Sequence, residues 1–354
     1  MAGDADIVVA RKKPCYVELV AGRTYSWCSC GRSRTQPFCD GSHKGTGFLP
    51  LVFKAKAAED VLFCVCKQTK TPPFCDGAHN NLSTTYDLDD PESPANRAIA
   101  QVSAAADGKA LLDGGCYVCT ISGDTLTRRG VLGHRRVIGS GDGALHQSLF
   151  YLECARGASP VAGFDDRHVI LFVSSGSGRV VIADRPFLVA ANTGVYVRPG
   201  EAFRLENDDD EALAVFAAAC PFADAIAWHD AMPARFDAAL PRRTIGIDPD
   251  AKTRMGDRFF QMLVDKTLGS DVVTQFIGEI PKSKAMPHRH LYEESLIVMR
   301  GHGMMWTEGR KASVAAGDVI FLPRKQLHSL ECTDPGGMLV VGVIYPGDNP
   351  SINY

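Results

Sequence analysis

Hydrophobic and polar residues alternate in short segments along most of the chain, with the period of two that is typical of strands. Near the N-terminus, residues 14–27, 49–56 and 61–65 show this pattern and are predicted to form β-strands. So short a segment can bury only a small core. Residues 1–82 are therefore predicted to form a small β-rich module.

Short predicted strands, separated by turns that contain Gly and Asp, continue from about residue 110 to the C-terminus. A segment at 222–242 is predicted to be helical and divides these strands into two similar halves. Two similar halves suggest a duplicated β-barrel. We place the first barrel at 107–240 and the second at 241–354, so the whole chain is predicted to be mainly β.

Residues 83–106 are predicted to link the N-terminal module to the barrels. The sequence between residues 80 and 97 is polar, acidic and contains Pro, which is typical of a linker. A short helix is expected from Asn96 to Ala106.

Composition narrows the class of protein. The chain has 354 residues, of which 45% are hydrophobic and 22% charged, as in soluble globular proteins. No apolar run is long enough for a transmembrane helix, and the acidic N-terminus lacks a secretory core. The net charge of −3 gives no basic footprint for nucleic acid. Together with the scattered spacing of the remaining cysteines, these features predict a cytoplasmic protein that binds neither membrane nor nucleic acid.

One pattern of cysteine and histidine occurs twice in the N-terminal module, at a spacing of 36 residues. Each copy reads Cys-x-Cys, eight residues, Cys, three residues, His, with Pro-Phe before the third Cys and Asp-Gly after it. The two copies comprise Cys28, Cys30, Cys39 and His43, and Cys64, Cys66, Cys75 and His79. Three thiolates and one imidazole can hold either zinc or a [2Fe–2S] cluster. Disulfide pairing explains the pattern less well, because the His recurs with the cysteines.

The repeated pattern closely resembles the CDGSH iron–sulfur family, in particular its tandem type, over about residues 11–82. The resemblance implies a [2Fe–2S] cluster at each copy, bound by three Cys and one His. A pair of zinc knuckles is the alternative, although zinc knuckles usually contain Cys-x2-Cys. A His ligand raises the reduction potential of a cluster and makes the site sensitive to protons. The N-terminal module is therefore expected to transfer electrons or to sense redox state.

A second group of metal-ligand residues lies in the predicted second barrel. His288 and His290 alternate, which would place both on one face of a strand, and Glu294 follows four residues later. His328 ends a Gly-x5-Pro-x4-His segment, which in a strand–turn–strand setting would return the imidazole across the barrel. These four side chains are predicted to meet at one site.

The two segments are similar to the two motifs of the cupin family, His-x-His-x3-Glu-x6-Gly and Gly-x5-Pro-x4-His, over about residues 245–348. The resemblance implies a β-barrel that binds one divalent metal through His288, His290, Glu294 and His328. We assign Fe(II) first, while nitrogen and oxygen ligands also accept Mn, Ni, Cu or Zn. A metal-free barrel with His residues in its core is the alternative. Lys325 stands where cupins usually have Gly, which alters a turn and not the ligands.

The first barrel is similar to a cupin that has lost its ligands. Asp165 and Val169 stand at the positions of the second His and the Glu, and Arg204 stands at the position of the last His. His168 alone remains nearby. This barrel is predicted to bind no metal and to pack against the second barrel.

A [2Fe–2S] module on one chain with a mononuclear site of three His and one Glu is analogous to a Rieske oxygenase, without shared sequence. The leading hypothesis is an iron-dependent oxygenase or oxidase that acts on a small molecule and O2, with the metal ligands as its only assigned catalytic groups. The chain lacks a nucleotide-binding motif, so an external reductase or ferredoxin is expected to supply electrons. One alternative is a redox or iron sensor without catalysis. Another is a redox-silent cupin isomerase or decarboxylase with regulatory clusters. Whichever function holds, the protein could be a homodimer.

Overall fold

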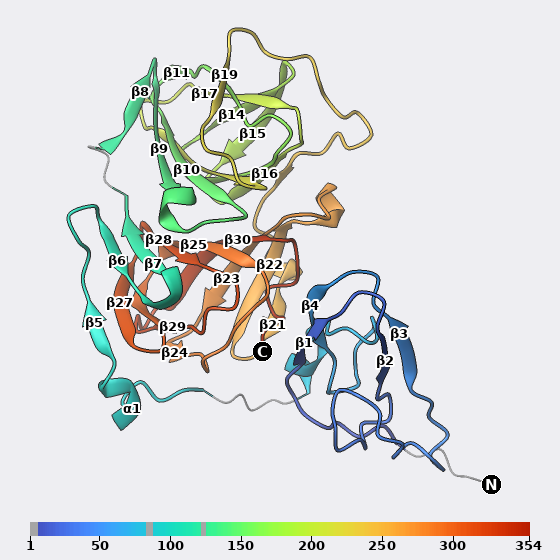
Figure 1. The fold of residues 1–354 in the computed structure, drawn as a ribbon. Helices are drawn as coiled ribbons and strands as arrows, with labels where there is room; N and C mark the ends of the chain where they lie inside the picture. The colour runs from blue at the N-terminus through green and yellow to red at the C-terminus, as the bar shows by residue number, and fades with distance from the viewer. Residues whose placement is uncertain (1–5, 83–87, 122–124) are drawn as a thin grey trace. The chain divides into compact units, whose positions relative to one another are not determined.

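The computed structural model describes residues 6–82, 88–121 and 125–354 (Figure 1). They form two compact units, one of Met1–Asp87 with His288–Leu291 and Asn349–Tyr354, the other of Leu88–Pro287 with Tyr292–Asp348. Strands dominate both units, so the predicted mainly β fold is confirmed. Among the described residues, no helix is long and apolar enough to cross a membrane.

The first unit has four short strands, β1 (Cys15–Leu19), β2 (Thr24–Trp27), β3 (Leu51–Lys54) and β4 (Glu59–Phe63). Antiparallel pairing joins β1 to β4 and β2 to β3. Isolated bridges join Trp27 to Phe38 and Phe63 to Phe74, so the backbone repeats at the same spacing as the cysteine pattern. Trp27 and Phe63 are both buried in one small core, to which both copies therefore contribute.

Thirteen strands form the two sheets of the first barrel, and their bounds follow the chain from residue 127 to residue 245. They are β8 (Thr127–Arg129), β9 (Leu132–Ile138), β10 (Ser148–Cys154), β11 (Gly157–Ala158), β12 (Val161–Gly163), β13 (His168–Ser175), β14 (Ser177–Ile182), β15 (Arg185–Ala190), β16 (Thr193–Val197), β17 (Ala202–Asn207), β18 (Leu213–Cys220), β19 (Ala227–His229) and β20 (Thr244–Ile245). One sheet has the order β20-β16-β13-β18-β10-β9-β8. The other has the order β15-β14-β17-β12-β19, and β11 pairs with β17.

The second barrel repeats this arrangement with strands from two separate parts of the chain. They are β5 (Ala100–Val102), β6 (Lys109–Leu111), β7 (Tyr117–Thr120), β21 (Thr253–Met255), β22 (Arg258–Val264), β23 (Thr274–Ile280), β24 (Ser283–Lys284), β25 (Glu293–Arg300), β26 (His302–Trp306), β27 (Arg310–Ala315), β28 (Asp318–Leu322), β29 (Ser329–Cys332) and β30 (Met338–Tyr345). The orders are β21-β22-β23-β30-β25-β28-β7-β6 and β24-β29-β26-β27-β5.

A glycine turn that occurs at the equivalent place in each barrel, after β13 and after β25, supports the duplication. Gly176 follows β13 and Gly301 follows β25, with φ values of 77° and 85°. A Cβ at either position would lie 2.6 Å or 2.5 Å from a backbone oxygen of the neighbouring strand segment. Only glycine therefore fits these two equivalent turns without strain.

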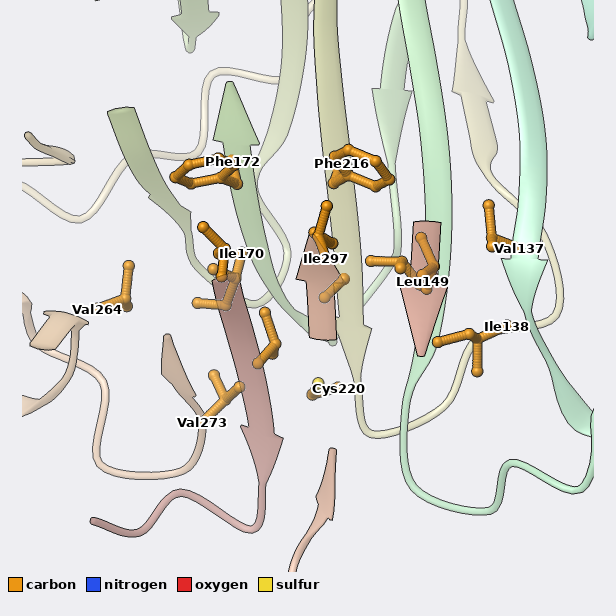
Figure 2. Close-up of a cluster of buried hydrophobic side chains, with 14 of the residues drawn as sticks. Val137, Ile138, Leu149, Ile170, Phe172, Phe216, Cys220, Val264, Val273 and Ile297 are labelled. Carbon is orange, nitrogen blue, oxygen red and sulfur yellow. The ribbon is translucent and has the colours of Figure 1, made fainter. Parts of the chain in front are cut away.

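A shared hydrophobic core joins the two barrels within the second unit. Figure 2 shows Ile170, Phe172 and Phe216 of the first barrel in the same buried cluster as Val264 and Ile297 of the second. Each barrel also has its own interior cluster of apolar side chains. The core thus confirms the prediction that the first barrel packs against the second.

Two predicted helices are wrong. Only the short α1 (Pro94–Arg97) forms in the segment expected to be helical from Asn96 to Ala106, and β5 follows it. The segment 222–242 contains β19, where Trp228 pairs with Ala162 of β12. Pro233 lies within this segment and would remove a hydrogen bond from a helix, while pairing to β12 satisfies the backbone instead.

The sequence-based division between linker and barrels also needs correction. β6 and β7, assigned to the first barrel at 107–240, extend the larger sheet of the second barrel, where β7 pairs with β28. β5, assigned to the linker at 83–106, pairs with β27. Alternation predicts a strand but cannot tell which sheet edge the strand joins. Residues 83–87 of the linker lie outside the described residues.

Candidate metal centres

The first cysteine pattern forms a loop cradle next to β2. The Sγ atoms of Cys28 and Cys30 are 3.7 Å apart, and Cys39 Sγ is 3.0 Å from His43 Nδ1. Backbone hydrogen bonds fix the cradle, because Cys28 N donates to Pro37 O and Cys39 N donates to Ser26 O. The four predicted ligands thus form a thiol pair and a thiol–imidazole pair.

The second cradle repeats the first. Cys64 and Cys66 have Sγ atoms 3.5 Å apart, and Cys75 Sγ lies 3.4 Å from His79 Nδ1. Cys64 N donates to Pro73 O and Cys75 N donates to Leu62 O, which are the same backbone bonds 36 residues later. Burial lowers the pKa of His79, which keeps its imidazole in the neutral form that binds a metal.

The Asp of each motif closes the turn that brings the third Cys and the His together. Asp40 accepts hydrogen bonds from Ser42 N at 3.0 Å and Arg34 N at 2.9 Å. Asp76 accepts equivalent bonds from Ala78 N and Lys70 N. Hydrogen bonds from Ser42 and then Arg34 hold the pKa of Asp40 well below its usual range, so this carboxylate stays charged.

The ligand atoms of each cradle are arranged in two pairs. A tetrahedral zinc site needs all four ligand atoms around one centre, whereas each iron of a [2Fe–2S] cluster takes only two protein ligands. Within the part of the chain that the structure describes, neither cradle gathers three ligand atoms within 4.8 Å of one another. The two ligand pairs of each cradle are therefore compatible with the two irons of a [2Fe–2S] cluster.

Backbone N–H groups point at the sulfur atoms and favour their charged form. Gly41 N lies 3.4 Å from Cys39 Sγ, and Lys67 N lies 3.2 Å from Cys64 Sγ. Burial opposes ionisation of Cys28, but hydrogen bonds with Ser33 and with the Cys30 thiol outweigh it and lower the pKa of Cys28. Burial raises the pKa of the Cys30 thiol, so within this pair Cys28 is the sulfur that ionises more readily.

A buried cation connects the two cradles, and the sequence analysis missed it. Trp27, which precedes Cys28, donates its indole N–H to Cys64 O at 2.7 Å. Lys67, which follows Cys66, donates to the same oxygen at 3.0 Å, and its Nζ lies 4.5 Å from the Trp27 ring centroid. A difference between the two copies could have revealed this contact. The second copy has Phe63 at the position of Trp27, and the first copy has Gly31 at the position of Lys67.

The second barrel brings three of its four predicted ligands together. His290, Glu294 and His328 are all buried, and each offers a ligand atom within 4.8 Å of the other two. His288 is not in this group, and its ring centroid lies 6.3 Å from that of His290. His288 and His290 lie in the loop between β24 and β25 rather than in the predicted strand, where Pro287 interrupts ladder pairing.

Neighbouring groups orient two of these ligands. His328 Nδ1 lies 2.9 Å from Gln326 O, and donation to this carbonyl leaves Nε2 as the atom available to a metal. Glu293 precedes Glu294 at the start of β25 and is buried. Its carboxylate accepts hydrogen bonds from three successive N–H groups of the first barrel, those of Leu145, His146 and Gln147. The first barrel therefore helps to fix the strand that carries Glu294.

The equivalent positions of the first barrel have other contacts. Val169 packs in the hydrophobic interior of that barrel. Arg204 forms an ion pair of 2.6 Å with Glu206. His168 Nδ1 lies 2.6 Å from the Tyr196 hydroxyl group. Across the described ranges, the first barrel contributes no group of three metal ligands.

A cavity of about 220 Å³ opens next to His328. Its lining residues come from the linker region, β24, β26 and the segments on either side of them. They are Asn96, Ile99, Lys284, Pro287, Trp306, Thr307, Glu308, Leu327, His328 and Ser329. This volume is larger than a single water molecule needs, so the cavity suits a small molecule.

Three family models match separate parts of the chain. They are the iron-binding zinc finger of CDGSH type at residues 2–44, the AraC-like ligand-binding domain at 150–252, and the cupin domain at 277–344. Mouse and human "CDGSH iron-sulfur domain-containing protein 3, mitochondrial" are 65% and 67% identical to 51 residues of this chain. The match covers 14% of this chain and only 37% and 40% of these relatives.

Solved structures resemble the two barrels. The E. coli protein Ylba has a TM-score of 0.53 at 14% identity, over 69% of this chain and 96% of that one. A mutant of Bacillus subtilis oxalate decarboxylase has a TM-score of 0.51 at 14% identity, over 65% and 77% of the two chains. At this identity the likeness shows the fold alone. The chain therefore combines a CDGSH-type iron–sulfur domain at its N-terminus with cupin domains in its C-terminal part.

Proposed function

We propose that the chain is an iron-dependent oxygenase or oxidase of a small molecule, to which two [2Fe–2S] clusters supply electrons. The convergence of buried His290, Glu294 and His328, with His328 in the wall of a cavity, is the observation that carries the proposal. A buried ligand group beside a small-molecule cavity is the usual form of a catalytic metal site. The cluster cradles on the same chain favour redox chemistry over hydrolysis or isomerisation.

In this account the eight cradle residues hold the clusters, which supply one-electron chemistry when bound. The cradle N–H groups stabilise the thiolates, and the imidazoles of His43 and His79 complete the ligand sets. Lys67 adds a positive charge near both cradles, since its Nζ lies 3.0 Å from Cys64 O and 4.5 Å from the Trp27 ring centroid. A nearby cation favours the added negative charge of a reduced centre.

In the second barrel, His290, Glu294 and His328 would hold Fe(II), with His288 as the fourth predicted ligand. A bound iron would supply redox chemistry with O2. His328 is oriented by Gln326 O, and the buried contacts of Glu293 hold the start of the strand that carries Glu294. The indole of Trp306 and the side chain of Leu327 line the cavity and would keep water away from the reacting atoms.

The proposal requires partners outside this chain. Electrons would come from an external reductase or ferredoxin, and the substrates would be O2 and a small molecule. None of the twelve cysteines, all of which lie in the described residues, forms a disulfide, which suits a reducing compartment such as the cytoplasm.

Metal content tests the proposal first. Protein purified without oxygen is expected to contain about five iron atoms per chain, from two [2Fe–2S] clusters and one mononuclear ion. Elemental analysis, with Mössbauer spectra to separate cluster iron from mononuclear iron, measures this ratio. Zinc in the cradles would refute the proposal that clusters supply electrons to the barrel. A redox-inactive metal in the barrel of active protein would favour a redox-silent cupin enzyme instead.

A further inference from the structure

The cavity beside His328 contains a buried ammonium group with an exchangeable partner. We propose that Lys284 binds the carboxylate of a small-molecule ligand in this cavity, and that Asp89 occupies the same position when the ligand is absent. The inference rests on the proposed function in one respect, because it takes the cavity to be the substrate site. It assigns the substrate to the class of small carboxylic acids.

Lys284 is placed to meet a ligand rather than solvent. It lies on β24, its side chain is only 1% exposed, and it lines the cavity together with His328. Its Nζ lies 4.8 Å from the ring centroid of Trp306, another lining residue. A buried ammonium group needs an anionic partner, because its desolvation is otherwise strongly unfavourable. Any ligand that separates Lys284 from its present partner must therefore bring a negative charge of its own.

The present partner of Lys284 is Asp89, whose Oδ2 accepts a short hydrogen bond from Nζ. Asp89 belongs to the segment that leads into the second unit, and Asn96 also donates to its carboxylate, at 3.0 Å. Burial by itself would raise the pKa of Asp89, but the hydrogen bonds from Lys284 and Asn96 and the positive charge of Lys284 together outweigh it and keep that pKa below the usual range. Asp89 is therefore a charged carboxylate of the chain itself, ion-paired with a lysine that lines the cavity.

Asp89 can leave Lys284 more easily than Lys284 can leave the cavity. The Asp89 side chain is 21% exposed, so its carboxylate reaches water with little further movement. The backbone contacts of the segment do not require the ion pair, because Asp89 N donates to Lys284 O and Leu88 bridges to Ala285. Exchange of one carboxylate for another also preserves the charge balance around Lys284.

Other charged groups lie near the cavity, and they bear on whether Lys284 can bind an anion. Lys311 lies against the same Trp306 ring, with Nζ 4.2 Å from the centroid, and donates to Asn96 O. Two carboxylates are also present: Glu308 lines the cavity, and Glu331 accepts the indole N–H of Trp306 at 2.9 Å. A second ammonium group on the indole face disfavours a cationic ligand. The apolar side chains of Ile99, Pro287 and Leu327 would contact the rest of an acid.

Isothermal titration calorimetry of the full-length chain with benzoate, and with benzamide as its neutral isostere, tests the inference. The unaltered protein is expected to prefer benzoate by on the order of tenfold, the effect of one charge-assisted hydrogen bond. Asp89→Asn removes the competing anion and should strengthen benzoate binding severalfold, with little change for benzamide. Lys284→Met should abolish the preference for benzoate.

Controls separate the inference from folding defects and from the metal site. The double variant Asp89→Asn/Lys284→Met leaves no unpaired charge, and thermal unfolding with cluster absorbance reports whether it folds. Equal binding of both probes by the unaltered protein, or a benzoate preference that survives in the folded double variant, would overturn the inference. Calorimetry involves no turnover, so a barrel without iron that still prefers benzoate would refute the proposed function alone.

Discussion

Replacing His328 with alanine is expected to remove the barrel metal and with it turnover, while both clusters remain. His328 is one of three buried residues whose ligand atoms converge, and it is 4% exposed. Loss of an outer-shell partner alone typically weakens metal binding by about 10–100-fold, so loss of a ligand should weaken it by at least about 100-fold. The cradles share no residue with this site, so their visible absorbance should be unchanged.

Metal analysis, visible absorbance and O2 consumption measure the three expectations. His302→Ala is the matched control, because His302 on β26 is 57% exposed in its side chain and pairs with Asp334 at 3.0 Å. Full activity in His328→Ala would make the barrel site a bystander. The oxygenase hypothesis would then fall, whatever the state of the clusters.

The second large effect is expected from Cys39→Ser. Cys39 Sγ forms the thiol–imidazole pair with His43, and a serine hydroxyl group is a much poorer ligand for iron. The variant should lose one cluster and about half of the visible absorbance, since the second cradle is built from its own ligands. The barrel should keep its metal, and turnover that depends on the lost cluster should stop.

Cys15→Ser provides the control for Cys39→Ser. Cys15 lies on β1 in the same module and belongs to neither cradle. It should keep both clusters and full turnover. If Cys39→Ser lost its cluster but retained activity, that cluster would be structural or regulatory, and a redox-silent cupin enzyme would explain the chain better.

The parts of this structure that follow local rules could be predicted from the sequence. The two copies of the Cys and His pattern, 36 residues apart, form the same backbone hydrogen bonds, such as Cys28 N to Pro37 O and Cys64 N to Pro73 O. Strand alternation likewise predicted the β-fold of both barrels. These features depend on neighbours in the sequence, so their signal is present in short segments.

The features that escaped prediction depend on contacts between distant residues. Strand β7 shows the right alternation, yet only its pairing with β28 decides which barrel it joins. The segment 222–242 has helical composition, but Pro233 and pairing with β12 prevent a helix. Lys284 and Asp89 are 195 residues apart, so nothing local relates them. The ligand loop itself was predicted as a strand, because alternation of His288 and His290 also occurs in loops.

Rapid mixing of reduced protein with oxygenated buffer tests the central claim, that cluster electrons reach the barrel metal, most directly. The clusters are reduced with dithionite, excess reductant is removed, and the return of cluster absorbance is followed together with O2 consumption. Free O2 also oxidises exposed clusters, so the comparison with His328→Ala decides. The account predicts faster reoxidation, with matching O2 consumption, when the barrel site is intact. Equal rates in the two proteins would contradict it.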